Sequence, residues 1–339
     1  DYLASAMAWL LLVDTPRSIV GFGPDIRDRA AIMETAWEAS WERDGESFLA
    51  EGIYDLWNTR TDLPLMVFNG TSVNDPCRFN ISVLDAAAHD AGQTCTSLEI
   101  FEGRTQGLGG ATSLAATKDL SDYLCDDQDV KLSTAVLLSA RFPIVSSSGK
   151  VGASLHCKEQ SATAFVVDGA YQEGSGAGTI SELWQQLEHH VDAINADSEF
   201  CVVPFFIQID NGYENPTAAP AGTSPIEALV PIRTIISSHF GRIANAREQA
   251  AIEFDRPFRI AGQPVVVLDH NGEPVESRYA RITTRAHPGI QAPLSWTLSN
   301  ASFDDLRSQL SITENQVEFD EIRRWLSGPM TCTEEGTSS

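Results

Sequence analysis

The chain has 339 residues, of which 42% are hydrophobic, and its 47 acidic residues against 23 basic residues give a formal charge of -24. This length and composition predict a globular protein with a substantial core, in one large domain or two, and exclude a disordered chain. So much negative charge repels phosphate, which disfavours nucleic acid as a partner and also disfavours purely electrostatic docking on anionic lipid.

A helical lead-in segment is predicted for residues 1 to 60. The apolar run from Ala6 to Val13 is too short to span a bilayer and lacks a basic stretch before it, so it indicates neither a transmembrane helix nor a signal peptide. Asp25 is suited to cap a helix over residues 25 to 44. One stripe of that helix is apolar and consists of Ile26, Ala30, Met33, Trp37 and Trp41. The chain opens inside a helical pattern without an initiator Met, so we expect it to be a piece of a longer protein.

A pair of strands is expected next, over residues 63 to 69 and 78 to 85, because two apolar runs flank the turn sequence NGTSVNDPC. Residues 86 to 115 are rich in Gly, Ala and Thr and carry no clear pattern. A helical pattern then runs from Leu132 to Ala140, and Pro143 ends it.

The following strand ends in an acid. Ala164 to Val167 form an apolar run typical of a strand covered on both faces, and Asp168 marks its exit onto a glycine-rich turn. Thr179 to Glu182 form a capping box that opens a helix, and a second buried strand follows over residues 201 to 210. Open α/β sheets bind ligands at the carboxyl ends of such strands, so Asp168 is a candidate site residue; an ordinary Asp-Gly turn is the alternative.

The last third of the chain continues the alternation of helices and strands. Ser224 to Glu227 form a second capping box, which opens a long amphipathic helix toward Phe254. The strand at residues 264 to 269 is expected to pair with residues 280 to 285. Two short helices are expected near the end, at residues 303 to 310 and 319 to 326. This order of elements predicts an α/β sandwich.

The six cysteines lie at positions 77, 95, 125, 157, 201 and 332 and contain no Cys-x-x-Cys pair, a spacing that disfavours zinc. Buried free thiols are the simplest interpretation for a chain of this size. One or two disulfides are the alternative, because three stretches match the N-glycosylation sequon. The sequons begin at Asn69, Asn80 and Asn300, and so short a motif leaves the compartment open.

Neither a metal nor a cofactor is expected. None of the seven histidines has a metal-ligand spacing, and the adjacent His189 and His190 point to different faces near a helix end, where they complement its dipole. The stretch from Gly174 to Gly178 lies between a strand and a helix, as in dinucleotide sites. Its first glycine follows the strand by six residues, however, and the expected acid falls inside the helix near Asp192.

The sequence contains no nucleophile elbow of the α/β-hydrolase kind. That elbow is Gly-x-Ser-x-Gly, because a sharp strand-to-helix turn leaves no room for side chains beside the serine. Ser47, Ser72, Ser154 and Ser224 each have a glycine two residues before them, but none has a glycine two residues after.

Several stretches resemble the patatin-like phospholipases. STAVLLSARFPIVSSSG (133 to 149), followed by FVVDGAYQEGSGAGTISELW, is similar to the family's helix, Ala-x-Phe-Pro turn, strand and Asp-Gly-Gly or Asp-Gly-Ala motif. LPLMVFNGTSVNDPCRFNISVLD is similar to its strand, Asn-x-Thr turn and second strand, and PLSWTLS (293 to 299) resembles a stretch near the end of some bacterial members. The sharpest element is Asp168-Gly169-Ala170.

The resemblance implies a patatin-like α/β sandwich with a mainly parallel central sheet flanked by helices. Residues 61 to 339 would be the C-terminal portion of that domain, with its N-terminal part missing. The resemblance also implies a serine and aspartate dyad whose serine lies upstream, outside this chain. Asp168 matches the dyad acid, which can take the serine proton if it is partly desolvated and its pKa is raised.

Several residues near Asp168 in the sequence have both a functional and a structural interpretation. Gly169 would let backbone and substrate approach closely, or would simply form the turn, and Ala170 completes the motif. Phe142 and Pro143 are expected to line the acyl chain, with core packing as the alternative. The family more often shows Asn where Gly174 stands, a departure that leaves the dyad assignment intact.

The expected function is hydrolysis of a lipid or phospholipid ester by a soluble or peripherally membrane-associated protein, with no cofactor and no nucleic-acid partner. The chain alone is expected to be inactive because it lacks the nucleophile. A catalytically inactive patatin-like binding or scaffold protein is the main alternative, and a nucleotide-binding oxidoreductase is a further one.

Overall fold

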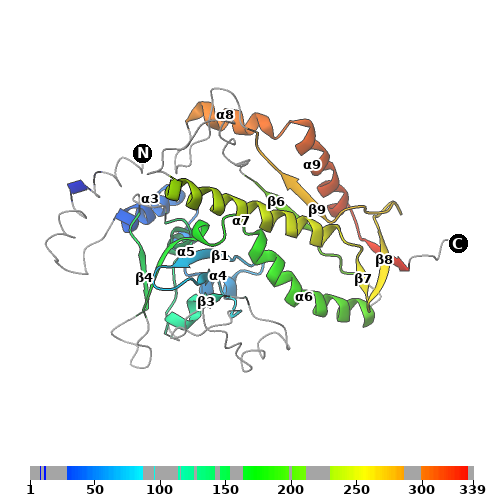
Figure 1. Cartoon of the computed structure of the whole chain (residues 1–339), viewed down its shortest axis with the longest axis horizontal. Coiled ribbons are helices and arrows are strands. Elements are labelled where there is room, and N and C mark those ends of the chain that lie inside the picture. Colours follow the sequence, from blue (N-terminus) through cyan, green and yellow to red (C-terminus); the bar gives the residue numbers. More distant parts are fainter. Residues whose placement is uncertain are drawn as a thin grey trace. The chain divides into compact units, whose positions relative to one another are not determined.

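The computed structural model describes residues 8, 11–12, 29–86, 95, 114, 116–125, 128–141, 146–152, 163–197, 201–210, 230–285 and 299–334. The chain divides into two compact units, Asp1–Gly174 and Ser175–Ser339, which we call unit 1 and unit 2 (Figure 1). Each unit combines helices with strands, so the predicted mixed α/β class is confirmed. The helical lead-in predicted for residues 1 to 60 is part of unit 1.

Unit 1 is built on a five-stranded sheet in the order β3-β2-β1-β5-β4. Its strands are β1 (Phe68–Ser72), β2 (Arg78–Ile81), β3 (Thr117–Asp119), β4 (Gly149–Gly152) and β5 (Thr163–Asp168). The pairs β1–β2, β1–β5 and β4–β5 are antiparallel, whereas β2 and β3 run parallel. The strand pair predicted around NGTSVNDPC is confirmed as β1 and β2.

The expectation of a mainly parallel sheet is wrong for unit 1. A parallel neighbour needs a crossover connection of about a dozen residues or more. Residues 73–77 alone separate β1 from β2, and residues 153–162 separate β4 from β5, so each pair folds back as antiparallel neighbours. The parallel pair is β2 and β3, which are far enough apart in the sequence for a crossover.

The core of unit 1 lies between the sheet and its helices. The predicted helix from Leu132 is confirmed as α5 (Leu132–Ser139), which packs on β1 and β5 and is itself covered by α3 (Arg29–Arg43). Residues of α4 (Ile53–Thr59) and of the short 3-10 helix η3 (Leu120–Tyr123) complete it. One hydrophobic cluster fills this space: Ile53, Leu56, Phe79, Ile81, Leu120, Tyr123, Leu132, Ala135, Leu138, Val151, Ala164 and Val166.

The apolar stripe predicted for α3 is used only in part. Ala30 and Met33 are buried, but Trp41 near the end of the helix is 42% exposed. The predicted cap at Asp25 and the stripe residue Ile26 lie outside the described residues. The stripe therefore meets the core at the start of α3 and leaves it by the last turn.

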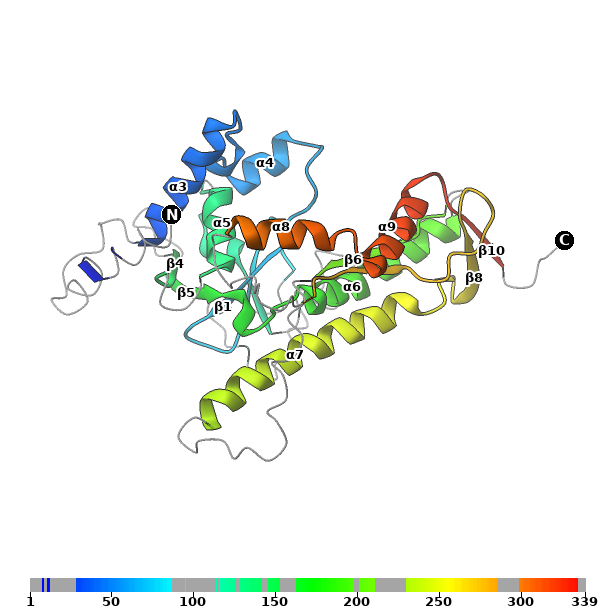
Figure 2. The same ribbon diagram turned by 90° about the horizontal axis from the view of Figure 1, so that it is seen from above.

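The described part of unit 2 contains two long helices, α6 (Ala177–Asp197) and α7 (Val230–Asp255), which lie side by side (Figures 1 and 2). Two shorter helices follow, α8 (Asn300–Gln309) and α9 (Thr313–Leu326), as predicted, although α9 begins earlier than expected. A parallel pair joins β6 (Phe206–Ile209) to β9 (Tyr279–Ile282). A second sheet has the order β10-β8-β7, from β10 (Thr331–Glu334), β8 (Gln263–Leu268) and β7 (Arg259–Ile260).

The strand predicted at residues 264 to 269 is confirmed as β8, but its predicted partner is wrong. A turn after β8 is built on Asp269, whose carboxylate accepts the backbone N–H groups of Asn271 and Glu273 at 2.8 and 2.9 Å. This turn returns the chain along β8 only as far as Val275, whose N–H donates to Val267. The next strand, β9, pairs with β6 instead, and β8 pairs with β10.

The capping box predicted at Thr179 is wrong, because α6 begins two residues earlier, at Ala177. The Ser175 hydroxyl accepts the N–H of Ala177 at 3.2 Å, and Gly176 between them has a φ of +72° that favours glycine. The second predicted capping box, Ser224 to Glu227, lies outside the described residues. The long helix expected toward Phe254 is confirmed as α7.

The expectation of free thiols is wrong for the described cysteines. Cys77 is joined to Cys95 in unit 1, with Cα atoms 5.4 Å apart, and Cys201 to Cys332 in unit 2, with Cα atoms 5.8 Å apart. Cys125 is also disulfide-bonded. Both Cα separations are ordinary for a disulfide. Sequence spacing alone does not indicate which cysteines meet in space.

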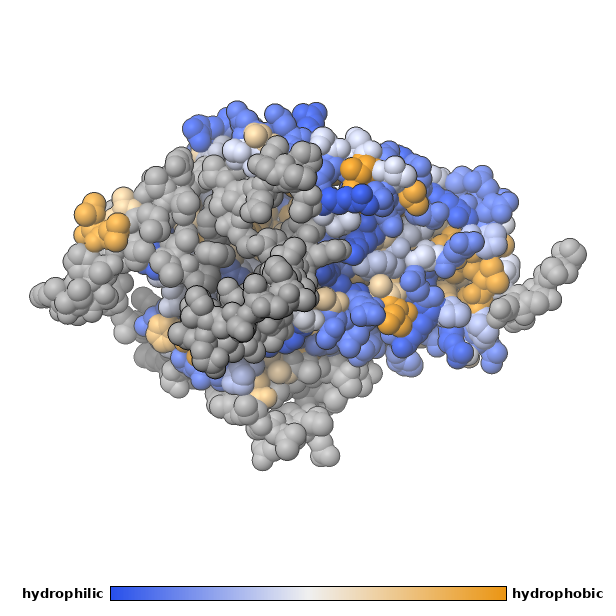
Figure 3. All heavy atoms as spheres, turned by 45° about the horizontal axis from the view of Figure 1, so that its top comes forward, coloured by the Kyte–Doolittle hydropathy of each residue, from blue (hydrophilic) through white to orange (hydrophobic). Residues whose placement is uncertain are grey.

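The described helices include none that is long and apolar enough to cross a membrane. In the view of Figure 3, the described surface is largely hydrophilic, and its apolar residues stand in small separate groups.

Candidate functional site

Asp168 is the last residue of β5 and the first residue of a tight turn. Its side-chain Oδ1 accepts the backbone N–H of Ala170 at 2.9 Å, which caps the 3-10 helix η4 (Gly169–Tyr171). The side chain is half-buried. The turn is therefore present, and it holds the carboxylate in a fixed orientation at the end of the strand.

Gly169 follows Asp168 at a point where two backbones approach very closely. A Cβ at this position would lie 1.9 Å from the carbonyl oxygen of Asn69 in β1, so no side chain fits there. The Ser139 hydroxyl of α5 donates to the same oxygen at 2.7 Å. Gly169 does not have a positive φ, so it is this contact, rather than backbone strain, that requires glycine.

The alternation of side chains places Asp168 on the face of the sheet that carries the core. Asp168 lies directly opposite Gly70 in the β5–β1 pair, and Phe68 lies directly opposite Ile81 in the β1–β2 pair. Directly opposite residues share a face, as do residues two apart along one strand. Asp168, Phe68 and Ile81 therefore lie on one face, with Phe68 roughly 7 Å along β1 from Gly70.

A small apolar pocket of about 20 Å³, with room for about one water molecule, opens at the same end of the sheet. It is formed by α4, the segment before β1 and the end of β2, and its lining comprises Ile53, Leu56, Trp57, Leu63, Pro64, Met66, Phe68, Ile81, Ser82 and Val83. Because β5 is antiparallel to β1, β5 ends where β1 begins, and the pocket wall starts at that edge. The carboxylate and the pocket therefore share one face and one end of the sheet.

A neutral phenol lies beside the pocket. The hydroxyl of Tyr54 in α4 donates to the carbonyl of Ser82 at 3.4 Å. Burial, with a further contribution from the Asp119 carboxylate, raises the pKa of Tyr54 to about 12. The phenol therefore stays protonated at physiological pH, and the pocket keeps its apolar character.

Two of the predicted site residues, Phe142 and Pro143, lie outside the described residues. The apolar face of the helix before them, α5, is used by the core, because Leu132, Ala135 and Leu138 all belong to its hydrophobic cluster. The structure thus brings together Asp168, Gly169 and Ala170 in one turn, and the α4 pocket lies at the same end of the sheet.

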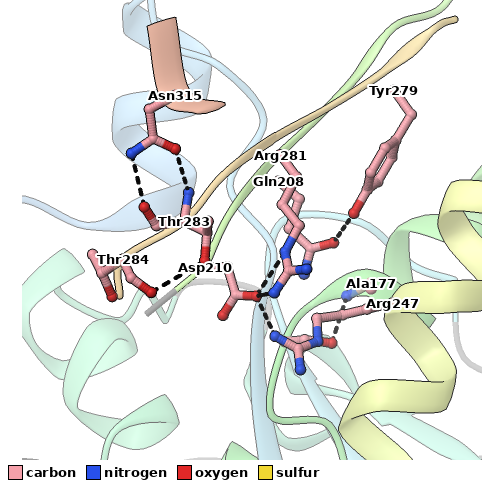
Figure 4. Close-up of polar contacts among 10 residues, drawn as sticks. Ala177, Gln208, Asp210, Arg247, Tyr279, Arg281, Thr283, Thr284 and Asn315 are labelled. Carbon is pink, nitrogen blue, oxygen red and sulfur yellow. Dashed lines mark hydrogen bonds and ion pairs between the residues drawn. The ribbon is translucent and has the colours of Figure 1, made fainter. Parts of the chain in front are cut away.

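Unit 2 contains a second polar cluster, which the sequence did not predict as a site (Figure 4). Asp210, directly after β6, is 7% exposed, and its Oδ2 accepts from the guanidinium groups of both Arg247 of α7 and Arg281 of β9. The signal in the sequence was an acid directly after an apolar run, as at Asp168. The two arginines lie 37 and 71 residues away, so no local pattern relates them to Asp210.

The polar side chains around Asp210 form hydrogen bonds with one another or with the backbone. The Tyr279 hydroxyl donates to Gln208 Oε1 at 2.7 Å, which adds a side-chain contact between β9 and β6. Asn315 of α9 exchanges two hydrogen bonds with the backbone of Thr283, at 2.8 and 3.0 Å, beside the end of β9 (Figure 4). These contacts join β6, β9, α7 and α9, and we interpret the cluster as a structural one.

Within the described residues, no three His, Cys, Asp or Glu side chains gather in a way that would hold a metal ion. The chain matches no family model, no curated protein and no solved structure. The interpretation of Asp168 therefore depends on its motif and on the geometry around it.

Proposed function

We propose that this chain carries the acid of a patatin-like acyl hydrolase that cleaves lipid or phospholipid esters. The observation that supports the proposal most is the position of Asp168: a carboxylate held by the Ala170 N–H at the end of a strand, followed by a glycine whose contact with Asn69 leaves no room for a side chain. Such a carboxylate can serve as the base for ester cleavage. The pocket beside α4, at about 20 Å³, is too small for an acyl chain and is not part of the proposed site.

In the proposed mechanism, Asp168 accepts the proton of a serine hydroxyl as the serine oxygen attacks the ester carbonyl. The alcohol leaves with a proton, and water then releases the acyl group from the serine. The Ala170 N–H holds the carboxylate in place during these steps. The serine belongs to a Gly-x-Ser-x-Gly elbow, which the 339 residues do not contain, and we propose that it lies upstream in the natural protein.

A catalytically inactive binding or scaffold protein of the same fold is the second candidate. The observation that favours it is the missing elbow, since an acid without a nucleophile cannot form an acyl-enzyme. Nothing comparable favours a nucleotide-binding oxidoreductase. Dinucleotide folds bind at the end of a parallel strand, whereas β5 is antiparallel to both of its neighbours.

Covalent labelling distinguishes the two candidates. We expect the purified 339-residue chain neither to hydrolyse a p-nitrophenyl ester nor to react with a fluorophosphonate. The longest natural protein that contains this sequence should do both, with the label on an elbow serine identified by mass spectrometry. Labelling of the 339-residue chain itself would contradict the proposed dyad, and absence of labelling in the longer protein would establish the inactive alternative.

A further inference from the structure

The three sequons of this chain lie in very different surroundings. Asn69-Gly-Thr and Asn80-Ile-Ser are in neighbouring strands of the unit 1 sheet, whereas Asn300-Ala-Ser begins a helix of unit 2. A glycan on asparagine is bulky and hydrophilic, so the folded protein accepts it only where the side chain faces solvent. The three sites can therefore be ranked by their burial and by the hydrogen bonds they make.

The Asn80 sequon is incompatible with a glycan in the folded protein. Asn80 is 1% exposed, and its Nδ2 atom, the one that would carry the sugar, donates to Asp119 Oδ1 at 2.6 Å and to the carbonyl of Leu84 at 3.2 Å. The Asp119 carboxylate is fully buried and also accepts the N–H of Ala86 at 2.8 Å. A sugar on this nitrogen would break the network and fill the space it occupies.

The Asn69 sequon is enclosed by the sheet. Asn69 is half-buried in the central strand β1, directly opposite Asn80, and Gly169 of η4 comes close to its carbonyl. The sequon hydroxyl residue, Thr71, is 7% exposed. Directly opposite residues have Cβ atoms ~5 Å apart on the same face, so a sugar on Asn69 would meet the buried network of Asn80.

The Asn300 sequon also has a buried hydroxyl residue, Ser302, which is 5% exposed, but its asparagine is unlike the other two. It is exposed, and it is the first residue of α8, directly after Ser299, whose hydroxyl caps the helix by accepting the N–H of Ser302 at 3.1 Å. The contacts that shape this helix start thus come from the two flanking serines. The Asn300 side chain can carry a large substituent while these contacts stay in place.

The disulfides indicate the compartment in which such a substituent is added. All described cysteines are disulfide-bonded, in both units of the chain. Disulfides persist in secreted proteins and are reduced in the cytosol, except in hyperthermophiles. Hyperthermophile proteins are enriched in lysine, and this chain has only four, at positions 118, 131, 150 and 158. The chain therefore has the features of a protein that folds in an oxidising secretory compartment.

We propose that Asn300 is an N-glycosylation site and that Asn69 and Asn80 are not. The donor is a lipid-pyrophosphate-linked oligosaccharide. The amide nitrogen of Asn300 forms a bond to C1 of the first sugar as the bond from C1 to the pyrophosphate oxygen breaks. The lipid pyrophosphate leaves with the electron pair, the nitrogen gives up one proton, and nothing is oxidised or reduced.

The decisive test is mass spectrometry of the protein purified from its natural source. Release of N-glycans by peptide N-glycosidase in heavy-oxygen water should convert Asn300, and neither Asn69 nor Asn80, to heavy-labelled Asp. An unlabelled Asn300 peptide would overturn the proposal, and so would label at Asn80.

Variants expressed through the secretory pathway of an animal cell provide the matched control. The unchanged chain should show one glycosidase-sensitive mobility shift, which Asn300→Gln and Ser302→Ala should abolish. Ser302→Thr, which keeps the sequon, should keep the shift, and Asn69→Gln should leave it unchanged. A shift that survives Asn300→Gln would contradict the proposal.

Discussion

Different interactions stabilise the interior of each of the two units. Unit 1 has one continuous hydrophobic cluster between a five-stranded sheet and its covering helices. Unit 2 has two small sheets and long helices, and both units contain buried charges, such as Lys118 and Asp119 in unit 1 and Asp210 and Arg278 in unit 2. An isolated pair of strands is marginally stable in water, so the small sheets of unit 2 need support from the helices and contacts around them.

Arg278 shows how unit 2 accommodates such charges. It is 6% exposed, its guanidinium lies over the rings of Phe254 and Phe258 at 5.7 and 5.1 Å, and it donates to backbone carbonyls. Burial lowers the pKa of Arg278. The comparison teaches that unit 1 builds one apolar core on a single sheet, whereas the small sheets of unit 2 are joined to the elements around them by polar contacts and by the Cys201–Cys332 disulfide.

The largest effect should follow from removing the Cys201–Cys332 disulfide. It closes a loop of 131 residues, and the chain-entropy estimate for a loop of this length is ~5 kcal/mol. Cys77–Cys95 closes only 18 residues, which corresponds to ~3 kcal/mol. We expect the Cys201→Ser, Cys332→Ser double variant to destabilise unit 2 more than the Cys77→Ser, Cys95→Ser variant destabilises unit 1. Hydrogen exchange resolved by peptide measures each unit separately, and equal losses would contradict the comparison.

A cavity in the core should affect unit 1 selectively. Phe79 is fully buried, so Phe79→Ala should cost ~4 kcal/mol of unfolding free energy, with the loss of hydrogen-exchange protection confined to unit 1. Phe303 of unit 2 is 55% exposed and serves as the matched control, because Phe303→Ala should cost less than ~0.5 kcal/mol. Similar costs for the two variants would show that unit 1 does not depend on this core.

Breaking the polar cluster should affect unit 2. Asp210→Ala leaves Arg247 and Arg281 without their shared carboxylate, and the expected cost is ~3 kcal/mol in chemical unfolding. Asp320→Ala removes an exposed carboxylate that pairs with Arg323 and should cost close to nothing. If both variants unfolded at the same denaturant concentration, the cluster would not be a stabilising feature.

The smallest effect is a pH dependence at Asp269. The hydrogen bond from Arg324 Nε, at 2.6 Å, is the main cause that lowers the pKa of Asp269 from 3.8 to about 2. A lowered carboxyl pKa contributes stability that is present above pH 3.8 and is lost as the pH falls through about 2. Asp269→Asn should therefore flatten the fall in melting temperature across this window.

Asp62 provides the comparison in unit 1. Arg60 also lowers its pKa to about 2, but the Asp62 side chain is 65% exposed, so water screens the pair. Asp62→Asn should change the acid melting curve less than Asp269→Asn does. If the Asp62 variant changed the curve more, the conclusion that the buried pair in unit 2 contributes more to stability at acid pH would be wrong.

The sequence predicted elements better than it predicted their partners. The β1–β2 pair, α5, and Asp168 at the end of β5 follow from local patterns of apolar residues and turn residues, which the sequence shows directly. The pairing of β8 with β10, and of Asp210 with its arginines, depends on contacts between distant residues. Hydrophobic periodicity indicates the face that a strand buries but not the strand beside it.

For the candidate site, too, the local features were predicted and the contacts between distant residues were not. The motif at Asp168 was predicted from its residues, because an acid and a glycine at a strand exit are a local signal. The contact that requires glycine at position 169 was not predicted, since it is made with the carbonyl of Asn69, one hundred residues earlier. The pocket beside α4 was also missed, because it is assembled from three separate segments.

The most direct test of the proposed dyad is the turnover of an Asp168→Asn variant in the natural protein that carries the elbow serine. Asparagine keeps the side-chain oxygen that accepts from Ala170, so the melting temperature should stay that of the unchanged protein. Turnover should fall ~10²–10⁴-fold, as expected for loss of a general base, while Asp320→Asn should leave turnover unchanged. If Asp168→Asn kept full turnover while Gly169→Val, with a side chain against Asn69, unfolded the protein, Asp168 would be only a turn residue and the dyad assignment would be wrong.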